Sequence, residues 1–332
     1  MKIISPGFTE IYNSNPQKHI EEIARTCYKS NDLITDDSNK TFIKNLHNRK
    51  HWAMLEHYIF IYQANTSFFE TIVEETFVHA TRTVIEIPHE DGGHRQTLRN
   101  IISFSARSIL DLLEKYKDDS YIRKNLIQLC EQVVADYDCD ELFGNKFKKV
   151  IRTDWTKIED VNMLTPEEQW EHGWKSIKFV CDRGVSHEIV RHRDASFAQE
   201  STRYCNYSKD KFGKEITVIK PLMFNADNEE GSIGRQKYVV WEEGIKTSEK
   251  AYFNLLDMGA TAQEARSVLP NSLKTEIIMT ARNYEWGHFF ELRCDKYAHP
   301  QMREIAIPTF NYFNDCNNTL FNRNTVIFSD ET

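Results

Sequence analysis

Hydrophobic and polar positions alternate with two different periods along this chain of 332 residues. Strand-like runs cover His57–Tyr62, Ile216–Lys220 and Glu276–Thr280. The helical period, with apolar residues three and four positions apart, predicts helices at Gln17–Tyr28, Asp37–Arg49, Ser67–Val78, Ile101–Tyr116, Tyr121–Asp136, Tyr238–Leu256, Tyr284–Tyr297 and Pro300–Phe313. Helices and strands mixed in this order predict an α+β fold.

Polar stretches and capping residues mark the connections between these elements. Pro88–Thr97 is predicted as a polar linker, Asn225–Arg235 as an acidic loop, and the chain from Asn317 as a loose tail. Thr261 and Glu264 have the spacing of a capping box, which predicts a short helix that Pro270 ends.

Composition narrows the class of protein. No run of about 18 apolar residues occurs, so no membrane span is expected, and the first residues lack the apolar stretch of a secretory signal. The seven cysteines never have Cys-x-x-Cys spacing, which indicates neither a zinc ribbon nor a disulfide framework and favours a reducing cytoplasm. A net charge of −8 argues against a broad nucleic-acid surface. With 12 glycines and no Gly-x-Gly-x-x-Gly loop, the chain has no Rossmann-type dinucleotide site.

The stretch from Arg191 to Tyr204 concentrates charged and hydroxyl side chains. It reads Arg-His-Arg-Asp-Ala-Ser-Phe-Ala-Gln-Glu-Ser-Thr-Arg-Tyr. Guanidinium and hydroxyl groups suit a polyanionic ligand, whereas a solvated charged helix end is the alternative. The preceding apolar run, a turn at Gly184 and a helix cap at Ser186 predict a short helix that delivers the arginines, which favours the ligand site.

This cluster resembles the signature of the flavin-dependent thymidylate synthases. Arg-His-Arg at 191–193 is followed by seven residues and then Ser201, and residues 182–193 and 199–208 are similar to that family throughout. The similarity is continuous over 176–313, and residues 25–30 and 51–57 resemble the family's opening. It implies a central sheet flanked by helices and the reductive methylation of dUMP to dTMP. Methylenetetrahydrofolate would be the carbon donor and NADPH-reduced FAD the hydride source, in a homotetramer whose FAD and dUMP sites are shared between subunits.

The resemblance also implies roles for individual residues. Arg293 is the expected electrostatic catalyst, placed beside the uracil, and Arg266 is expected to reach the nucleotide from a neighbouring subunit. The expected FAD-binding residues are His57, Ile59, Arg191, His192, Arg193, Gln199, Arg282, Asn283, Tyr284 and His288. The expected dUMP-binding residues are Glu188, Ile189, Val190, Arg191, Gln199, Glu200, Ser201, Thr202, Arg203, Arg266 and Arg293.

Spacing alone leaves the role of Arg293 open. Trp286, Phe289 and Phe290 precede it on one helical face. The alternative is therefore that the aliphatic part of the Arg293 side chain covers the core while its guanidinium group lies in water. A lone strand histidine such as His57 is likewise more often structural than catalytic.

The chain departs from the family pattern at the expected flavin wall. Where the family usually has Asn, an apolar residue and Arg, this chain has Arg282-Asn283-Tyr284. Gly287 stands where a basic residue is common, and Gln199 where a glutamate is preferred.

Compact family members lack most of residues 66–172. We interpret this stretch as a largely helical insertion that packs on the core. Residues 1–320 are then one catalytic domain, interrupted at about 66–172, and 321–332 are a loose tail.

The sequence suggests three other hypotheses. A zincin site needs histidines four apart on one helical face, but His187 and His192 are five apart, so no metal site is expected. Cys205 lacks the Pro-Cys-His context of the unrelated, cysteine-dependent thymidylate synthases. The alternative function is a non-catalytic protein that binds nucleotides or single-stranded nucleic acid through the same arginines.

Overall fold

The computed structural model describes residues 1–75, 78–88, 93–224, 231–316 and 320–321. The strands are β1 (Lys2–Ile4), β2 (Gly7–Ile11), β3 (Ile59–Ala64), β4 (His79–Pro88), β5 (His94–Ser105), β6 (Trp155–Lys157), β7 (Trp174–Asp182), β8 (Ser196–Gln199), β9 (Thr217–Ile219) and β10 (Lys274–Arg282). The α-helices are α1 (Pro16–Thr26), α2 (Ser38–Asn48), α3 (Thr66–Ile72), α4 (Ala106–Lys115), α5 (Ser120–Tyr137), α6 (Pro166–His172), α7 (Arg183–Ile189), α8 (Ile233–Asp257), α9 (Ala262–Ala265), α10 (Asn283–Arg293) and α11 (Pro300–Cys316). Short 3-10 turns lie at Asn31–Leu33, Trp52–Glu56, Asp140–Phe143, Val161–Met163, Asp210–Phe212 and Arg266–Val268.

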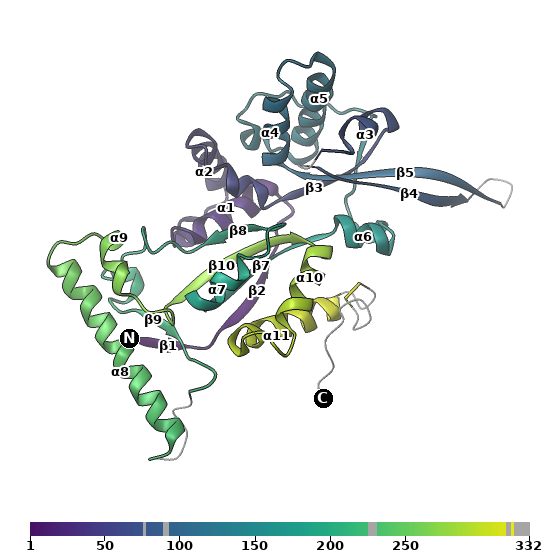
Figure 1. Cartoon of the computed structure of the whole chain (residues 1–332). Helices are drawn as coiled ribbons and strands as arrows, with labels where there is room; N and C mark the ends of the chain where they lie inside the picture. Colours follow the sequence, from purple (N-terminus) through teal and green to yellow (C-terminus); the bar gives the residue numbers. More distant parts are fainter. Residues whose placement is uncertain (76–77, 89–92, 225–230, 317–319, 322–332) are drawn as a thin grey trace.

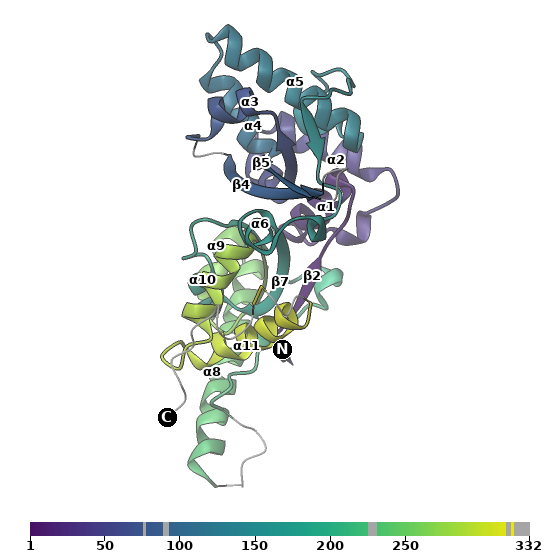
Figure 2. The ribbon, with the colours of Figure 1, turned by 90° about the vertical axis from the view of Figure 1, so that its right-hand side faces the viewer.

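Two antiparallel four-stranded sheets organise the chain, which confirms the α+β class. We call β2-β7-β10-β8 the core sheet and β4-β5-β3-β6 the hairpin sheet, while β1 and β9 form a separate parallel pair. Figures 1 and 2 place the hairpin sheet and helices α3 to α5 beside the core sheet, with α10 and α11 on the other side of the molecule.

The core sheet buries one face beneath helices. Ile177 and Phe179 of β7 and Met279 of β10 pack against Phe289 and Phe290 of α10, in a cluster that also takes in α7 and α11. Side chains alternate between the two faces of a strand, so the neighbouring positions carry polar groups such as Lys178 to the opposite face. That opposite face is where polar side chains are available for ligands.

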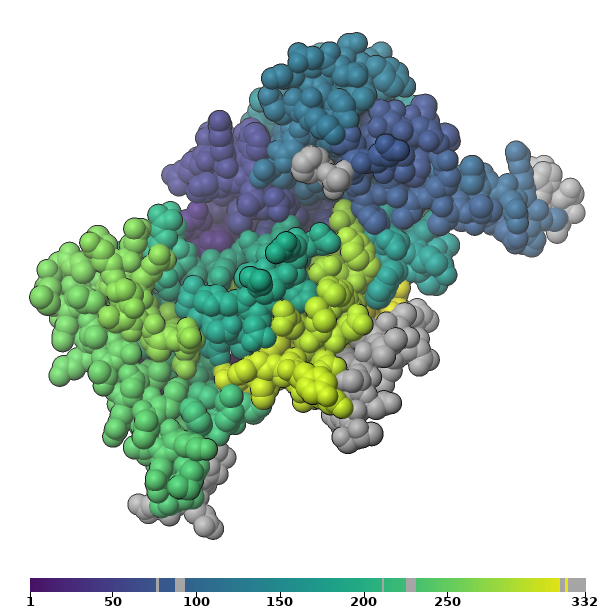
Figure 3. Space-filling model, viewed as in Figure 1, coloured from purple at the N-terminus to yellow at the C-terminus, as the bar shows by residue number. Residues whose placement is uncertain are grey.

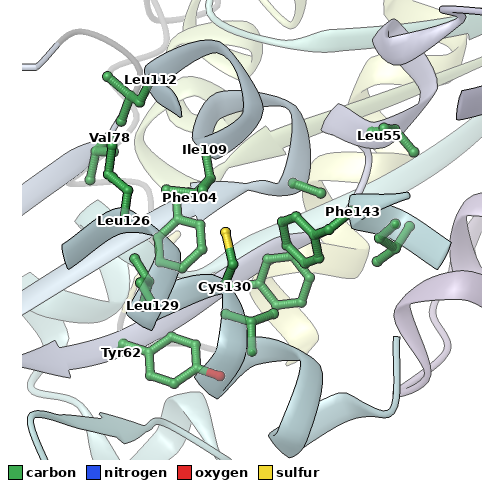
Figure 4. Packing of buried hydrophobic residues seen from close by; sticks show 14 of the residues in the cluster. Leu55, Tyr62, Val78, Phe104, Ile109, Leu112, Leu126, Leu129, Cys130 and Phe143 are labelled. Atoms are coloured by element: carbon green, nitrogen blue, oxygen red, sulfur yellow. The ribbon is translucent and has the colours of Figure 1, made fainter. Parts of the chain in front are cut away.

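The hairpin sheet has its own apolar cluster. Tyr62 of β3 and Phe104 of β5 face Ile109 of α4 and Cys130 of α5, as Figure 4 shows. Beyond this cluster β4 and β5 continue as a long two-stranded arm, which projects from the rest of the molecule in Figure 3. The stretch predicted as a largely helical insertion therefore contains three strands as well as helices.

Two predictions within this stretch were wrong. The helix predicted at Ile101–Tyr116 begins only at Ala106, because residues up to Ser105 belong to β5. Ile101 and Ile102 are both fully buried, on opposite faces of the sheet, and such a continuous apolar run has no strand period to detect. The linker predicted at Pro88–Thr97 is also partly strand, since β4 includes Pro88 and β5 starts at His94, and 89–92 lie outside the described residues.

The other predicted elements differ from the structure mainly at their ends, whereas the strands β1, β2, β4, β6, β7 and β8 were not predicted. The short helix α7 is capped by Asp182, whose carboxylate accepts a hydrogen bond from the Val185 N–H at 2.7 Å, and not by Ser186. Of the acidic loop predicted at Asn225–Arg235, residues 225–230 lie outside the described residues. The loop was predicted to continue to Arg235, but α8 already begins at Ile233. Phe321, the first residue of the predicted tail, is buried against Trp170, Phe290 and Phe313, and residues 322–332 are not described.

None of the helices in the described part of the chain combines the length and apolar composition that crossing a bilayer requires.

Candidate functional site

An open pocket of about 430 Å³ lies between the core sheet and the hairpin sheet, and we call it the arginine pocket. Three guanidinium groups line it, from Arg107 of α4, Arg193 after α7, and Arg282 at the end of β10. Three carboxylates share the lining, from Glu56, Asp111 and Asp194. The pocket gathers four of the residues expected to bind FAD, which are Ile59, Arg193, Arg282 and Tyr284.

His57 lies behind the wall of this pocket. Its imidazole is fully buried, and Nδ1 is 2.7 Å from the hydroxyl of Thr280, which lines the pocket. Burial lowers the pKa of His57 to about 3, so the ring is neutral at physiological pH. His57 therefore supports the wall as a neutral hydrogen-bonding group.

The remaining expected FAD residues lie away from the pocket lining. Asn283 is buried at the start of α10, where its Nδ2 donates to the Gln169 carbonyl at 2.9 Å. His288 is half exposed on α10, and His192 is buried beneath Arg293. Arg191 is exposed at the surface.

The departure at Gly287 has a packing reason. A Cβ atom at this position would lie 2.3 Å from Cη2 of Trp170, because the indole ring lies directly over the glycine. Trp170 belongs to α6, within the stretch predicted as an insertion, and its ring also packs on Phe321. A long basic side chain at 287 is incompatible with this packing.

Arg293 sits in a hydrogen-bonded cluster at the end of α10. Its Nε donates to His192 Nε2 at 3.1 Å, its Nη1 to the Glu188 carboxylate at 3.3 Å and its Nη2 to the Glu188 carbonyl at 3.0 Å. His192 Nε2 accepts this bond, and its Nδ1 lies 3.3 Å from the carboxylate of Glu285. These contacts use three of the five N–H bonds of the guanidinium and hold it in one orientation.

Of the neighbouring expected dUMP residues, only some are accessible. Ile189 is fully buried in the core beneath α7, whereas Val190 is 40% exposed beside it. Glu188 is the partner of Arg293, with about a third of its side chain exposed.

The expected dUMP loop, Gln199 to Arg203, leaves the end of β8 and lies against α9. Thr202 Oγ1 accepts a hydrogen bond from Arg266 Nη1 at 3.5 Å, and Arg203 Nε donates to Gln263 at 3.1 Å. Arg266 thus contacts this loop within the same chain, and that contact needs no neighbouring subunit. Gln199 connects the loop to α7, because its amide donates to Ser186 Oγ at 2.9 Å.

Glu200 belongs to a network of charges that sequence reasoning missed. Its carboxylate is 2.8 Å from Lys274 Nζ, and Lys274 is 2.7 Å from Glu276, which also pairs with Lys29. Together with Lys178 these residues line a second pocket of about 710 Å³, the lysine pocket. Lys274 and Glu276 are two apart on one strand, a spacing that puts both on one face of the sheet and could have signalled the cluster.

Two residues of the lysine pocket, Lys274 and Glu276, have pKa values shifted in favour of their charged forms. Burial alone would raise the pKa of Glu276, but the ammonium groups of Lys274 and Lys29 outweigh it and hold that pKa at about 2. Burial would likewise lower the pKa of Lys274, whereas Glu200 and Glu276 hold it well above its usual value.

The structure also shows where Cys205 and the two histidines of the zinc hypothesis lie. Cys205 is buried, with 1% of its surface exposed. His187 is exposed on α7, while His192 is buried beneath Arg293. Among the residues that the structure describes, no three His, Cys, Asp or Glu side chains are grouped so as to hold a metal ion.

Comparison with known proteins identifies the family to which this chain is similar. The model of the family described as "Thymidylate synthase complementing protein" matches residues 11–75 and 112–316. Among curated proteins, the chain is 35% identical over 127 residues to a flavin-dependent thymidylate synthase of Geobacter sulfurreducens, covering 38% of this chain and 49% of the relative. It is 32% identical over 126 residues to that of Pyrococcus furiosus (38% and 48%), and 29% identical over 153 residues to that of Corynebacterium aurimucosum (45% and 57%).

These alignments span about half the length of the curated relatives. The family match is interrupted at residues 76–111, which carry β4, β5 and the start of α4. After that interruption it includes the arginine cluster, the core-sheet strands β7, β8 and β10, and helix α10. The chain belongs to the thymidylate synthase complementing protein family.

Proposed function

We propose that this protein is a flavin-dependent thymidylate synthase. It converts dUMP to dTMP with methylenetetrahydrofolate as carbon donor and NADPH as reductant of FAD. The observation that carries the proposal is the arginine pocket, where Ile59, Arg193, Arg282 and Tyr284 come together from distant parts of the chain. Family membership and the names of the relatives support the same reaction.

The donor set of the arginine pocket fits a flavin dinucleotide. Guanidinium groups form paired hydrogen bonds to phosphates, and three of these groups line the pocket. Arg107 also pairs with Asp111 and Arg282 with Ser103, while Arg193 is exposed. The ring of Tyr284 offers a flat surface to the cofactor. When bound and reduced, FAD supplies the hydride of the reaction. The pocket residues bind and orient it.

Arg293 supplies positive charge for the uracil ring. The contacts to His192 and Glu188 leave two of its N–H bonds for a ligand. A fixed cation beside N3 and O4 stabilises negative charge that builds on the ring, which makes C5 nucleophilic without a covalent bond to the enzyme. His192 and Glu188 fix the guanidinium before the substrate arrives, so no reorganisation is needed during the reaction.

The nucleotide phosphate is assigned to the loop from Gln199 to Arg203. Arg203 is exposed at its tip, and Arg266 lies beside the Thr202 hydroxyl, so two guanidinium groups and a hydroxyl converge there. Backbone N–H groups of such a loop also favour phosphate.

Within one chain the residues assigned to dUMP form two groups. Arg293 ends α10, whereas Arg203 and Arg266 lie against α9, and Figure 1 separates these helices. This separation supports a site completed by more than one copy of the chain, as in a homotetramer with shared FAD and dUMP sites. Such sharing brings Arg293 of one copy to the phosphate-binding loop of another.

The proposal is tested on purified protein supplied with FAD. We expect a yellow protein whose visible flavin spectrum changes on addition of dUMP, and whose flavin is reduced by NADPH. Protein that stays colourless with excess FAD and does not oxidise NADPH contradicts the proposal. Binding of dUMP without flavin chemistry would indicate a nucleotide-binding protein instead.

A further inference from the structure

The hairpin segment at 76–111, where the family match is interrupted, forms part of the arginine pocket. Six of its residues line the pocket, and these are Val78, His79, Ser105, Arg107, Ser108 and Asp111. The opposite wall is the end of β10 and the start of α10, where the chain departs from the usual family residues at Arg282-Asn283-Tyr284. The extra segment and the unusual residues thus face each other across one pocket.

Two residues of the hairpin contact these unusual residues directly. The imidazole of His79 stacks on the ring of Tyr284, with centroids 5.7 Å apart and planes inclined by 29°. Ser103 accepts two hydrogen bonds from Arg282, from Nε to its hydroxyl and from Nη2 to its carbonyl, each at 3.2 Å. Both Tyr284 and Arg282 are pocket residues that we assign to FAD.

His79 and Ser103 form one cross-strand pair. They are direct partners in the register of β4 and β5, and directly opposed residues of an antiparallel pair project to the same face of the sheet. One position of the hairpin therefore presents both contacts together.

A second histidine fixes this pair. His172 is fully buried, with Nδ1 2.9 Å from the Ser103 hydroxyl and Nε2 2.6 Å from the Thr81 hydroxyl. Its ring also meets the edge of His79 at 5.0 Å, while His79 Nε2 is 2.8 Å from Glu171. The pair is thus held from behind by α6 and has little freedom to rotate.

We propose that His79 and Ser103 are positioning residues for the flavin cofactor, which hold Tyr284 and Arg282 in the wall of the arginine pocket. The proposal rests on the proposed function. It gives a role to the hairpin at 76–111, where the family match is interrupted. The hairpin supports the part of the pocket wall formed by Arg282 and Tyr284, which differ from the usual family residues. His79 acts through Tyr284, and Ser103 acts through Arg282.

A double-mutant cycle on FAD affinity tests the first of these links. We expect His79→Ala to weaken FAD binding roughly threefold to tenfold, the range of an aromatic pair interaction. In a Tyr284→Ala background the same substitution should have no further effect, because the residue through which it acts is gone. His79→Phe, which retains a ring, should bind FAD within about twofold of wild type. An equal loss in both backgrounds, or no loss from His79→Ala, overturns the proposal.

Further variants separate positioning from folding. His79→Gln retains a hydrogen-bond donor for Glu171 but removes the ring. Its FAD affinity should therefore match that of His79→Ala, and the variant that folds better is sufficient for the test. Val84→Ser, on the exposed arm of the same strand, is the matched control and should leave FAD affinity unchanged. Wild-type protein that fails to bind FAD overturns the proposed function together with this inference. Wild-type protein that binds FAD, with equal losses in both backgrounds of the cycle, overturns the inference alone.

Discussion

The core sheet and the hairpin sheet are both antiparallel and four-stranded, yet they bury their residues differently. The core sheet covers one face with α7, α10 and α11, while its other face packs Ala198 and Ile278 against Ile23 of α1 and carries the charged residues of the lysine pocket beside them. The hairpin sheet is buried on both faces near β3, whereas its projecting arm exposes Val84 and Leu98 by 62% and 55%. The core sheet therefore presents charged side chains in a pocket, while the hairpin sheet near β3 is filled mainly by apolar side chains.

The division of roles follows from this contrast. Arg293, His192 and the Gln199–Arg203 loop all belong to the core sheet and its helices, within the family match. The hairpin sheet adds residues to the arginine pocket from outside that match. We therefore expect substitutions in the core sheet to affect the reaction, and substitutions in the hairpin sheet to affect cofactor binding and stability.

The largest effects should come from emptying the two apolar clusters. Phe104→Ala in the hairpin sheet and Phe290→Ala in α10 remove fully buried rings and should each cost about 3–5 kcal/mol of unfolding free energy. If residues 1–320 form a single domain, urea titrations followed by fluorescence and by circular dichroism should give one coincident transition that both variants lower. Two transitions, with Phe104→Ala affecting only one, would show that the sheets unfold as separate domains.

Arg293→Ala should remove the reaction while retaining the flavin. Losing a fixed cation at the uracil should lower turnover by at least about a hundredfold, roughly 3 kcal/mol or more of transition-state stabilisation. Steady-state turnover and the flavin absorption of the same sample measure the two properties together. Lys296→Ala removes an exposed positive charge three residues further on and should be neutral. Unchanged turnover in Arg293→Ala would refute its assigned role.

The polar face of the core sheet predicts a defined dependence of stability on pH. The carboxyl of Glu276 has its pKa held at about 2, against a usual value of 4.5. A depressed carboxyl pKa stabilises the folded state above pH 4.5, and this contribution disappears as the pH falls from 4.5 towards 2. Glu276→Gln should therefore cost on the order of 3 kcal/mol at pH 7 and progressively less below pH 4.5.

Denaturant titrations of wild type and Glu276→Gln across this pH range measure the difference. Glu243→Gln, at an exposed position of α8, is the control and should show no such dependence. A difference between wild type and Glu276→Gln that stays constant from pH 7 to pH 3 would contradict the charge network.

The smallest predicted effect concerns the contact between α6 and α10. Gly287→Ala places a methyl group against Trp170 and should destabilise the protein by about 1–3 kcal/mol. Trp170→Leu in the same chain should relieve most of this cost. Gly244→Ala on α8, where nothing lies within 4 Å, should instead be neutral or slightly stabilising. Equal thermal shifts in the two alanine variants would mean that Trp170 is not the obstacle.

Predictability from sequence differed between the two sheets for physical reasons. The helices α10 and α11 bury one face each, so their period was visible, and Arg293 at the end of α10 was placed correctly relative to the apolar stripe. In β5 the buried end has no alternation of polar and apolar residues, and the exposed end has a single apolar residue, Leu98. The strand was therefore interpreted as linker and helix.

The site was predictable only where local motifs carry it. The arginine cluster and Arg266 could be named from the sequence because their residues are contiguous or match a motif. The contacts of His79 and Ser103 could not, because they depend on which strands pair and in what register. Long-range pairing of this kind leaves no mark in a local pattern.

The most direct test of the proposed chemistry is release of the C5 proton of dUMP. With dUMP carrying tritium at C5, the protein supplied with FAD, NADPH and methylenetetrahydrofolate should release tritium to water and form dTMP in equal amounts. Omission of FAD should abolish both, as should Arg293→Ala. Protein that binds FAD and dUMP, yet releases no tritium with every component present, would contradict the account.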